Sequence, residues 1–210
     1  MIIKYLSKIQ WNKQVVNFLI EKLKKNKKKT LRLILTGGNS SKPINKHIIN
    51  KLYKNYNLNI YLSDERCAEK RRNFLNQTFF QNLNKKNRFT FFPILKKNLS
   101  FFESAKIYNN TIKFKPDLIL LSVAKDGHVA SIFNSNNEFK FKNIIFTKSK
   151  LNNFRRISIS KNYLKMNSNI ILLCNSFERL KSFSKYSKKR QHILNILSKK
   201  RKLLLITKKH

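Results

Sequence analysis

Glycine is the residue type that this chain most conspicuously lacks, with three in 210 residues. Average usage of about 7% would give roughly fifteen. Two of the three form the pair Gly37-Gly38, and the third is Gly127. Both places follow apolar runs that are predicted strands, where glycine permits positive φ and lets a ligand approach the backbone closely. We therefore expect these two loops to carry function.

Cysteine and long apolar runs are scarce as well. Cys67 and Cys174 are far apart and form no C-x-x-C pair, which excludes the usual zinc and redox motifs, and Cys174 is expected in the core. The chain has no run of about 18 apolar residues, so no membrane span is expected. Its first residues lack the apolar stretch of a signal peptide. A reducing cytoplasm is the expected location.

Acidic residues are the third scarcity, with nine Asp and Glu against 47 Lys and Arg and a net charge of +38. Nucleic-acid binding is one interpretation, because basic residues release counterions from phosphates. The other is A+T-rich coding, which favours Lys, Asn, Ile, Phe and Tyr over Gly, Ala and Pro. The basic residues are spread along the chain without a recognition module, so we favour coding bias and expect no nucleic-acid partner. A positive field also attracts small anionic substrates.

Apolar runs alternate with segments of helical spacing over a length that suits one domain, residues 1–210. Several runs are continuously apolar, as buried parallel strands are. Ser100 and Glu103 form a predicted helix-capping pair. The alternation predicts a doubly wound, Rossmann-like α/β fold with a mostly parallel sheet and helices on both faces. Strands are predicted near 31–35, 58–63, 117–122, 143–147, 156–160, 169–174 and 203–207, and helices at 11–25, 43–54, 72–84, 101–113 and 187–200.

Ligands of such sheets bind beyond the carboxyl ends of the strands. The first loop placed there is Thr36-Gly37-Gly38-Asn39-Ser40-Ser41. Its backbone N–H groups and hydroxyls suit an anion, and a helix opening near Pro43 adds its positive end. The alternative is an ordinary turn between a strand and a helix.

The second loop, Asp64-Glu65-Arg66, follows the predicted strand at 58–63. Arg66 is suited to two-pronged phosphate binding, and Asp64 or Glu65 to holding a sugar hydroxyl or orienting a base. The alternative is a surface ion pair with Lys70, Arg71 or Arg72.

The third loop carries Asp126-Gly127-His128. A histidine that titrates near neutral pH suits a general base acting on water, with Asp126 fixing its tautomer and Gly127 allowing a tight turn. Residues 129–133 are expected to form a short helix. The alternative is an N-cap aspartate beside an incidental exposed histidine.

Together these motifs resemble the 6-phosphogluconolactonases, over a region from about residue 11 to the C-terminus. The related glucosamine-6-phosphate deaminases also have Gly-His but continue with Ala-Phe-Asn-Glu, so the continuation here favours the lactonase branch. The segments that carry the resemblance are Gly37-Gly38-Asn39-Ser40, Asp64-Glu65-Arg66-Cys67 with Asn73, and Leu118–Phe133, which ends in Asp-Gly-His-Val-Ala-Ser-Ile-Phe.

Two later positions match the family, and others depart from it. Arg156 falls at the arginine of an Arg-Ile-Thr segment, and Arg179 at the lysine of a Gly-x-x-Lys segment. The two glycines usual before x-Asp-Gly-His are Ser122 and Ala124 here, and the proline usual after the first loop is Ser41. Each glycine replacement adds a Cβ to a loop wall.

The resemblance implies a carboxylic ester hydrolase that converts 6-phosphoglucono-δ-lactone to 6-phosphogluconate in the oxidative pentose phosphate pathway, with no cofactor and no metal. His128 is the implied general base, together with Asp126. A glucosamine-6-phosphate deaminase-like isomerase and a basic nucleic-acid-binding protein are the alternatives. The expected assembly is a monomer or weak homodimer. The implied substrate-binding residues are Gly37, Gly38, Asn39, Ser40, Asp64, Arg66, Gly127, Arg156 and Arg179.

Overall fold

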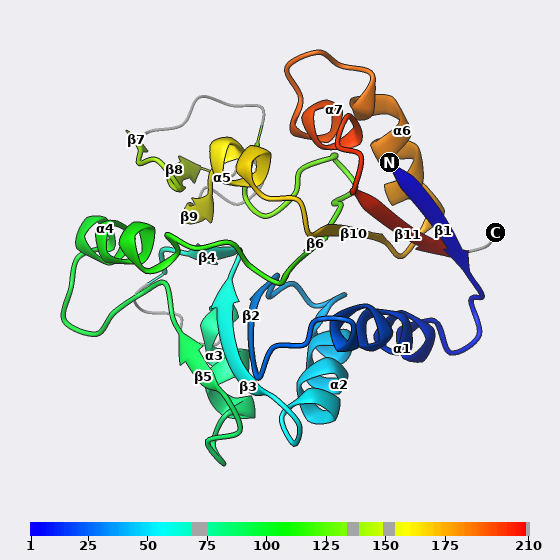
Figure 1. Ribbon diagram of the computed structural model, residues 1–210. Helices are drawn as coiled ribbons and strands as arrows, with labels where there is room; N and C mark the ends of the chain where they lie inside the picture. The colour runs from blue at the N-terminus through cyan, green and yellow to red at the C-terminus, as the bar shows by residue number, and fades with distance from the viewer. Residues whose placement is uncertain (69–74, 134–138, 149–153, 209–210) are drawn as a thin grey trace.

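The computed structural model describes residues 1–68, 75–133, 139–148 and 154–208 (Figure 1). Asn73, Lys70, Arg71 and Arg72 therefore lie outside the described residues. The elements, in chain order, are β1 (Ile2–Leu6), α1 (Trp11–Lys24), β2 (Thr30–Leu35), α2 (Lys42–Leu52), β3 (Asn57–Leu62), β4 (Asp64–Arg66), α3 (Asn76–Leu83), β5 (Thr90–Phe92), α4 (Phe101–Thr111), β6 (Leu118–Ser122), β7 (Phe139–Lys140), β8 (Ile144–Lys148), β9 (Arg155–Ile159), α5 (Lys161–Met166), β10 (Ile170–Cys174), α6 (Phe177–Ser187), α7 (Ile193–Ser198) and β11 (Leu204–Lys208).

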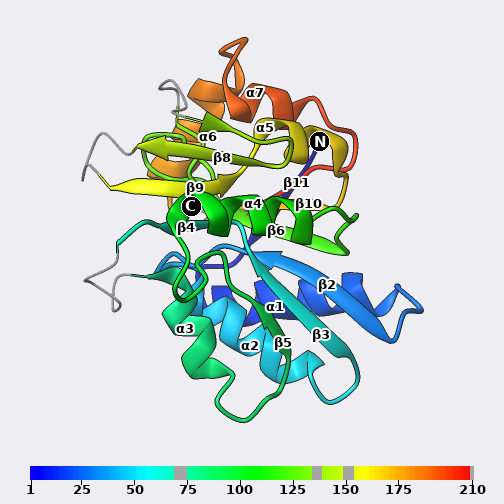
Figure 2. The same cartoon turned by 90° about the vertical axis from the view of Figure 1, so that its left-hand side faces the viewer.

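The larger sheet has seven strands in the order β1-β11-β10-β6-β2-β3-β5, and each neighbouring pair is parallel. Its central strands are buried along their length, as in Leu118–Leu121 and Ile170–Cys174, because helices cover both faces. Figures 1 and 2 show α1 and α2 on one face and α5, α6 and α7 on the other. The predicted doubly wound, mostly parallel fold is confirmed, and Cys174 is buried as expected.

The strand order reverses between β2 and β6, which pair from Leu33 with Leu118 to Leu35 with Leu120. From this pair the chain builds outward through β3 and β5 on one side and through β10, β11 and β1 on the other. A crevice forms at such a point because the loops after the two central strands diverge to opposite faces. The two glycine-bearing loops are the ones that leave β2 and β6 here.

A second sheet is antiparallel and has the order β4-β9-β8-β7. The predicted strands at 143–147 and 156–160 belong to it. Ser63 joins the two sheets, since its N–H donates to the Leu35 carbonyl in the first and its carbonyl accepts from Ile159 N in the second. The residues after β3 therefore pass directly from the central sheet onto the wall of the crevice.

Two helix predictions are wrong and one capping prediction is confirmed. The helix predicted at 187–200 is shorter, because α6 ends at Ser187 and only α7 lies within that range, starting at Ile193 after the His192 ring accepts from Leu194 N. The predicted helix 129–133 is a turn, with Ala130 at φ 51°. Ser100 and Glu103 form the expected capping box on α4. Within the described residues, no helix has the length and apolarity that a membrane crossing requires.

Candidate active site

A cavity of about 280 Å³ opens at the reversal point, above the carboxyl ends of β2 and β6. It brings together loops that are up to 143 residues apart in the chain, from Thr36 to Arg179. All three loops singled out from the sequence contribute to it. The lining residues are Thr36, Gly38, Asn39, Ser40, Asp64, Arg66, Asn76, Ser122, Ala124, His128, Ala130, Arg156 and Arg179.

The conformation of the loop after β2 is fixed by hydrogen bonds to its carbonyl groups. The Thr36 carbonyl accepts from Ser41 Oγ at 2.9 Å and from Asn45 Nδ2 at 2.8 Å, and Ser41 N donates to the Gly38 carbonyl at 2.9 Å. The backbone N–H groups of Gly38 to Ser40 donate no hydrogen bond within the described residues. With α2 starting at Lys42, these N–H groups suit an anion.

The two glycines of this loop have different roles. A Cβ on Gly37 would lie 2.3 Å from Asn76 Cβ, so this position must be glycine for α3 to pack here. A Cβ on Gly38 would meet nothing within 4 Å and would point into open space. Gly37 therefore lies behind the cavity wall and Gly38 lines the cavity.

Asp64 is buried and joins three parts of the site. Its Oδ1 accepts from Ser63 Oγ at 2.8 Å, and its Oδ2 accepts from Ser131 Oγ at 2.6 Å. Arg156 Nη1 lies 4.0 Å from Oδ2. Ser131 N also donates to Ser158 Oγ at 3.1 Å. These contacts fasten the turn after His128 to the antiparallel sheet and explain why residues 129–133 do not form a helix.

Glu65 is fully buried and is absent from the cavity lining. Its carboxylate accepts from Asn76 N at 2.8 Å and Gln77 N at 2.6 Å, and so caps the amino end of α3. Burial raises the pKa of Glu65 to about 7, against the opposing effect of its backbone donors. Glu65 thus stabilises the helix that carries Asn76 and does not hold a ligand.

Three arginines line the cavity. Arg66 and Arg156 are register partners across β4 and β9, and burial lowers the pKa of Arg156. Arg179, on α6, donates from Nη1 to the Val123 carbonyl at 3.0 Å and lies 3.4 Å from Ser40 Oγ. Phosphate oxygens are the natural partners of guanidinium groups gathered in this way.

His128 sits at the end of a tight turn that leaves β6. The turn is closed by Ala124 N donating to the His128 carbonyl at 2.9 Å and by Gly127 N donating to the Ala124 carbonyl at 3.0 Å. Gly127 has φ +84°, as expected for a glycine-dependent turn. The sequence prediction that this glycine permits the turn agrees with the structure.

The Asp126 carboxylate orients the imidazole. His128 Nδ1 lies 2.6 Å from Asp126 Oδ1, and this hydrogen bond is the main cause of the lowered pKa of Asp126. An ionised carboxylate only accepts, so Nδ1 carries the hydrogen, and Nε2 is then the acceptor nitrogen of a neutral ring. The Phe133 ring packs 4.6 Å away and His128 lines the cavity. This arrangement suits a general base.

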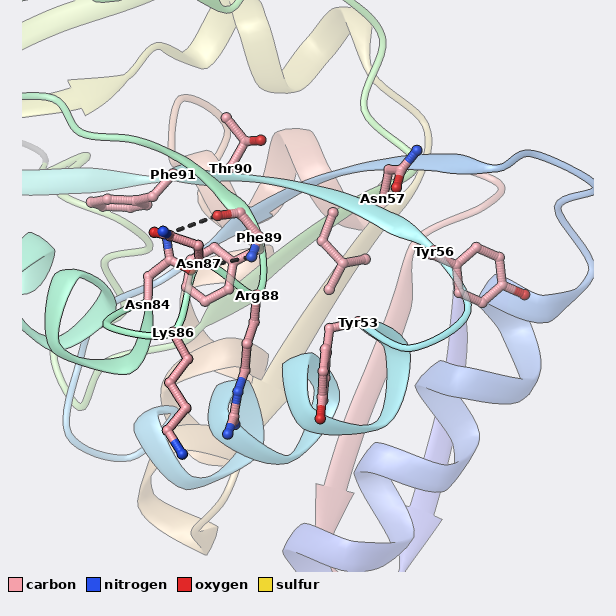
Figure 3. Close-up of a pocket in the computed structure, with 11 residues that line it drawn as sticks. Tyr53, Tyr56, Asn57, Asn84, Lys86, Asn87, Arg88, Phe89, Thr90 and Phe91 are labelled. Atoms are coloured by element: carbon pink, nitrogen blue, oxygen red, sulfur yellow. Dashed lines mark hydrogen bonds between the residues drawn. The ribbon is translucent and has the colours of Figure 1, made fainter.

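A larger groove of about 740 Å³ lies at the amino ends of β3 and β5, away from these loops (Figure 3). Its Asn84 side chain is used in hydrogen bonds to the Phe89 backbone, and Arg88 Nη1 donates to Asn50 Oδ1 at 3.1 Å. These polar groups serve the local structure. Within the described residues, no group of three or more His, Cys, Asp or Glu side chains could hold a metal ion.

Solved structures with this fold cover nearly the whole chain. The 6-phosphogluconolactonase of Thermotoga maritima matches with a TM-score of 0.81 at 21% identity over 99% of both chains. The 6-phosphogluconolactonase of Shewanella baltica matches with a TM-score of 0.83 at 16% identity, over 100% of this chain and 98% of its own. The enzyme of Trypanosoma cruzi matches with a TM-score of 0.80 at 15% identity, over 99% of this chain and 94% of its own. No curated protein matches by sequence. These likenesses show the fold.

The family model described as glucosamine-6-phosphate isomerases/6-phosphogluconolactonase matches residues 7–194. The chain belongs to this family. The resemblance inferred from the three sequence motifs is therefore confirmed. Of the site residues that this resemblance implied, Gly38, Asn39, Ser40, Asp64, Arg66, His128, Arg156 and Arg179 line the cavity. Gly37, Asp126 and Gly127 lie immediately behind it and support the lining residues.

The departures from the usual family pattern also lie at the cavity. Ser122 and Ala124 line it where the family usually has glycine, and Ala124 does not adopt positive φ. The turn is therefore unstrained at Ala124, and the added methyl narrows the cavity without distorting the loop. Asn76 is the lining residue that sequence reasoning missed, because its contact with Gly37 is formed only in the folded chain.

Proposed function

We propose that this protein hydrolyses 6-phosphoglucono-δ-lactone to 6-phosphogluconate at the cavity above β2 and β6. The observation that carries the proposal is the pairing of His128 with Asp126 at 2.6 Å in a cavity that three arginines also line. An oriented base and a cationic anion site in one cavity fit a substrate that has an electrophilic carbonyl and a phosphate.

The phosphate would be bound by Arg66, Arg156 and Arg179 together with the N–H groups of Gly38–Ser40. These donors come from β4, β9, α6 and the amino end of α2, so they surround an anion from several sides. Asp64 would accept from a sugar hydroxyl, since it is the lining carboxylate. The net charge of +38 would speed the encounter with a phosphorylated substrate.

His128 Nε2 would take a proton from water as the water oxygen attacks the lactone carbonyl carbon. The carbonyl oxygen becomes an oxyanion that loop N–H groups stabilise. When the tetrahedral intermediate collapses, the bond from the carbonyl carbon to the ring oxygen breaks. The ring oxygen recovers the proton from His128. Asp126 stabilises the imidazolium between these two transfers. No cofactor is needed in this scheme.

The family includes both isomerases and lactonases, so the preference for the lactonase is supported by the solved structures and by the residues that follow Gly-His. The structures of Thermotoga maritima, Shewanella baltica and Trypanosoma cruzi with this fold are 6-phosphogluconolactonases. The sequence Val129-Ala130-Ser131 after Gly-His also departs from the deaminase pattern. We further propose that the chain acts as a single domain in the cytoplasm, as a monomer or weak homodimer, on a small sugar phosphate and without nucleic acid.

The test is a lactonase assay with the purified protein, corrected for spontaneous ring opening, beside His128→Asn. Loss of the base should lower kcat by about 10²–10⁴-fold. Equal rates for wild type and His128→Asn would contradict the general-base mechanism. Ammonia release from glucosamine 6-phosphate would favour the isomerase instead, and salt-dependent RNA binding without lactonase activity would favour a nucleic-acid function.

A further inference from the structure

One side of α6 lies along the loop that carries His128. Glu178, Ser182 and Tyr186 are spaced four residues apart and so share one face of the helix. Each contacts the segment Lys125–Gly127, which immediately precedes His128. We call these three residues the α6 stripe.

The first two contacts of the α6 stripe are polar. Glu178 Oε2 lies 2.7 Å from Lys125 Nζ, and both side chains are more than half exposed. An exposed ion pair of this kind is weak because water screens it. Ser182 Oγ donates to the Lys125 carbonyl, which fixes the backbone itself. Of these two polar contacts, the Ser182 hydrogen bond is therefore the stronger restraint on the path of the loop.

The third contact is steric. The Tyr186 ring lies against Gly127 so closely that a Cβ on Gly127 would be 2.3 Å from Tyr186 Cδ2. The Tyr186 ring also stacks on the His192 ring, with centroids 4.6 Å apart and planes 19° apart. His192 is buried and caps α7. Tyr186 thus contacts both the turn and the residue that caps α7.

We propose that the α6 stripe is a positioning device for His128. The proposal rests on the proposed function, since it assumes that His128 acts in catalysis. Within the described residues, the stripe joins the segment Lys125–Gly127 to α6 through the ion pair and the hydrogen bond to Lys125 and the contact of the Tyr186 ring with Gly127. An error of about 1 Å in placing a catalytic group can cost about 10²-fold in rate. The α6 stripe supplies that precision without touching substrate, as none of its residues lines the cavity.

Disrupting the α6 stripe is expected to lower kcat more than it raises KM. Arg66 and Arg156, which would bind the phosphate, lie on the antiparallel sheet and do not depend on α6. Arg179 does lie on α6, so the variants must leave the helix intact. The Tyr186 hydroxyl forms no hydrogen bond within the described residues, so Tyr186→Phe should preserve the contact with Gly127.

The experiment compares Tyr186→Leu, Tyr186→Phe and Ser182→Ala with a matched control, Ser184→Ala. Ser184 is exposed on the side of α6 away from the loop. Tyr186→Leu should lower kcat by at least about 10-fold, up to about 10²-fold, with KM little changed. Ser182→Ala should lower kcat by a smaller factor. Tyr186→Phe and Ser184→Ala should match the wild type.

Hydrogen–deuterium exchange of residues 124–128 provides a readout that does not require activity. The amides of Ala124 and Gly127 should exchange faster in Tyr186→Leu and Ser182→Ala, and at the wild-type rate in the other two variants. If the wild type has no lactonase activity, the proposed function fails while exchange still tests the restraint. If kcat and exchange stay unchanged in Ser182→Ala and in any folded Tyr186→Leu, or if Ser184→Ala has equal effects, the proposal is wrong.

Discussion

Arg66 and Arg156 stand directly opposite each other across the antiparallel pair β4–β9. Like charges at paired positions of a sheet destabilise it. Burial lowers the pKa of Arg156, and Asp64 Oδ2 lies 4.0 Å from its Nη1. An anion between the two guanidinium groups would relieve their repulsion, so this pair links stability to ligand binding.

Inorganic phosphate is therefore expected to stabilise the folded protein. At a phosphate concentration about 100-fold above Kd the gain is about 2.7 kcal/mol, measured as a rise in Tm with phosphate at constant ionic strength. Arg156→Met should remove most of this rise and increase KM for the lactone. Chloride at equal ionic strength is the control. A Tm that rises equally with chloride would show general screening in place of a phosphate site.

Gly37→Ala and Gly38→Ala should separate stability from binding. The new Cβ at Gly37 would lie 2.3 Å from Asn76 Cβ, whereas at Gly38 it would meet nothing within 4 Å. Overpacking of this kind costs about 1–3 kcal/mol, so urea unfolding should show a lowered free energy of unfolding for Gly37→Ala. Gly38→Ala should remain stable and raise KM, because its methyl enters the cavity. Reversed effects would contradict the assigned roles.

Glu65 should make the protein less stable as pH rises. Its pKa is raised by burial from an ordinary 4.5 to about 7, so between these values the folded state retains a proton that the unfolded state has lost. The contribution is fully present below pH 4.5 and is lost as pH rises through 7. Relative to Glu65→Gln, the wild type should lose about 3 kcal/mol between pH 4.5 and 8. Urea unfolding across this range measures it, and parallel curves would contradict it.

His192 should make the protein less stable as pH falls, which is the opposite of the effect of Glu65. Its pKa is lowered from 6.5, chiefly by burial and then by Lys161 and Lys189, so the unfolded state binds a proton more readily. The contribution of His192 to the free energy of unfolding is present above pH 6.5 and is lost as pH falls below this value. His192→Asn retains a side-chain acceptor for Leu194 N and does not titrate. The Tm of this variant should fall less than that of the wild type between pH 7.5 and 5.5, and an equal fall would exclude the effect.

The central sheet was predictable from sequence because its main strands are continuous apolar runs that can be recognised without knowing their partners. Leu31–Leu35 and Leu118–Leu121 are apolar enough to require burial on both faces, whatever their partners. Glycine scarcity then pointed to the loops that leave β2 and β6. The reversal of strand order places those loops side by side, so the candidate site followed from topology once the fold class was known.

The remaining parts depend on contacts that local patterns do not encode. β4 has three polar residues and β5 has three residues in all, and they are strands only because β9 and β3 pair with them. The break between α6 and α7 depends on the His192 cap. The α6 stripe mixes an acid, a hydroxyl and a ring, which no hydrophobic period would select.

The contact between Arg179 and Ser40 joins residues 139 positions apart, and that between Ser131 and Asp64 spans 67. Closing loops of this length is slow relative to forming a helix, because chain entropy must be overcome before the contact is made. We therefore expect the cavity to assemble after the helices. During refolding, the circular dichroism signal of the helices should return before the capacity to bind phosphate, and during synthesis the cavity cannot close until α6 has been made.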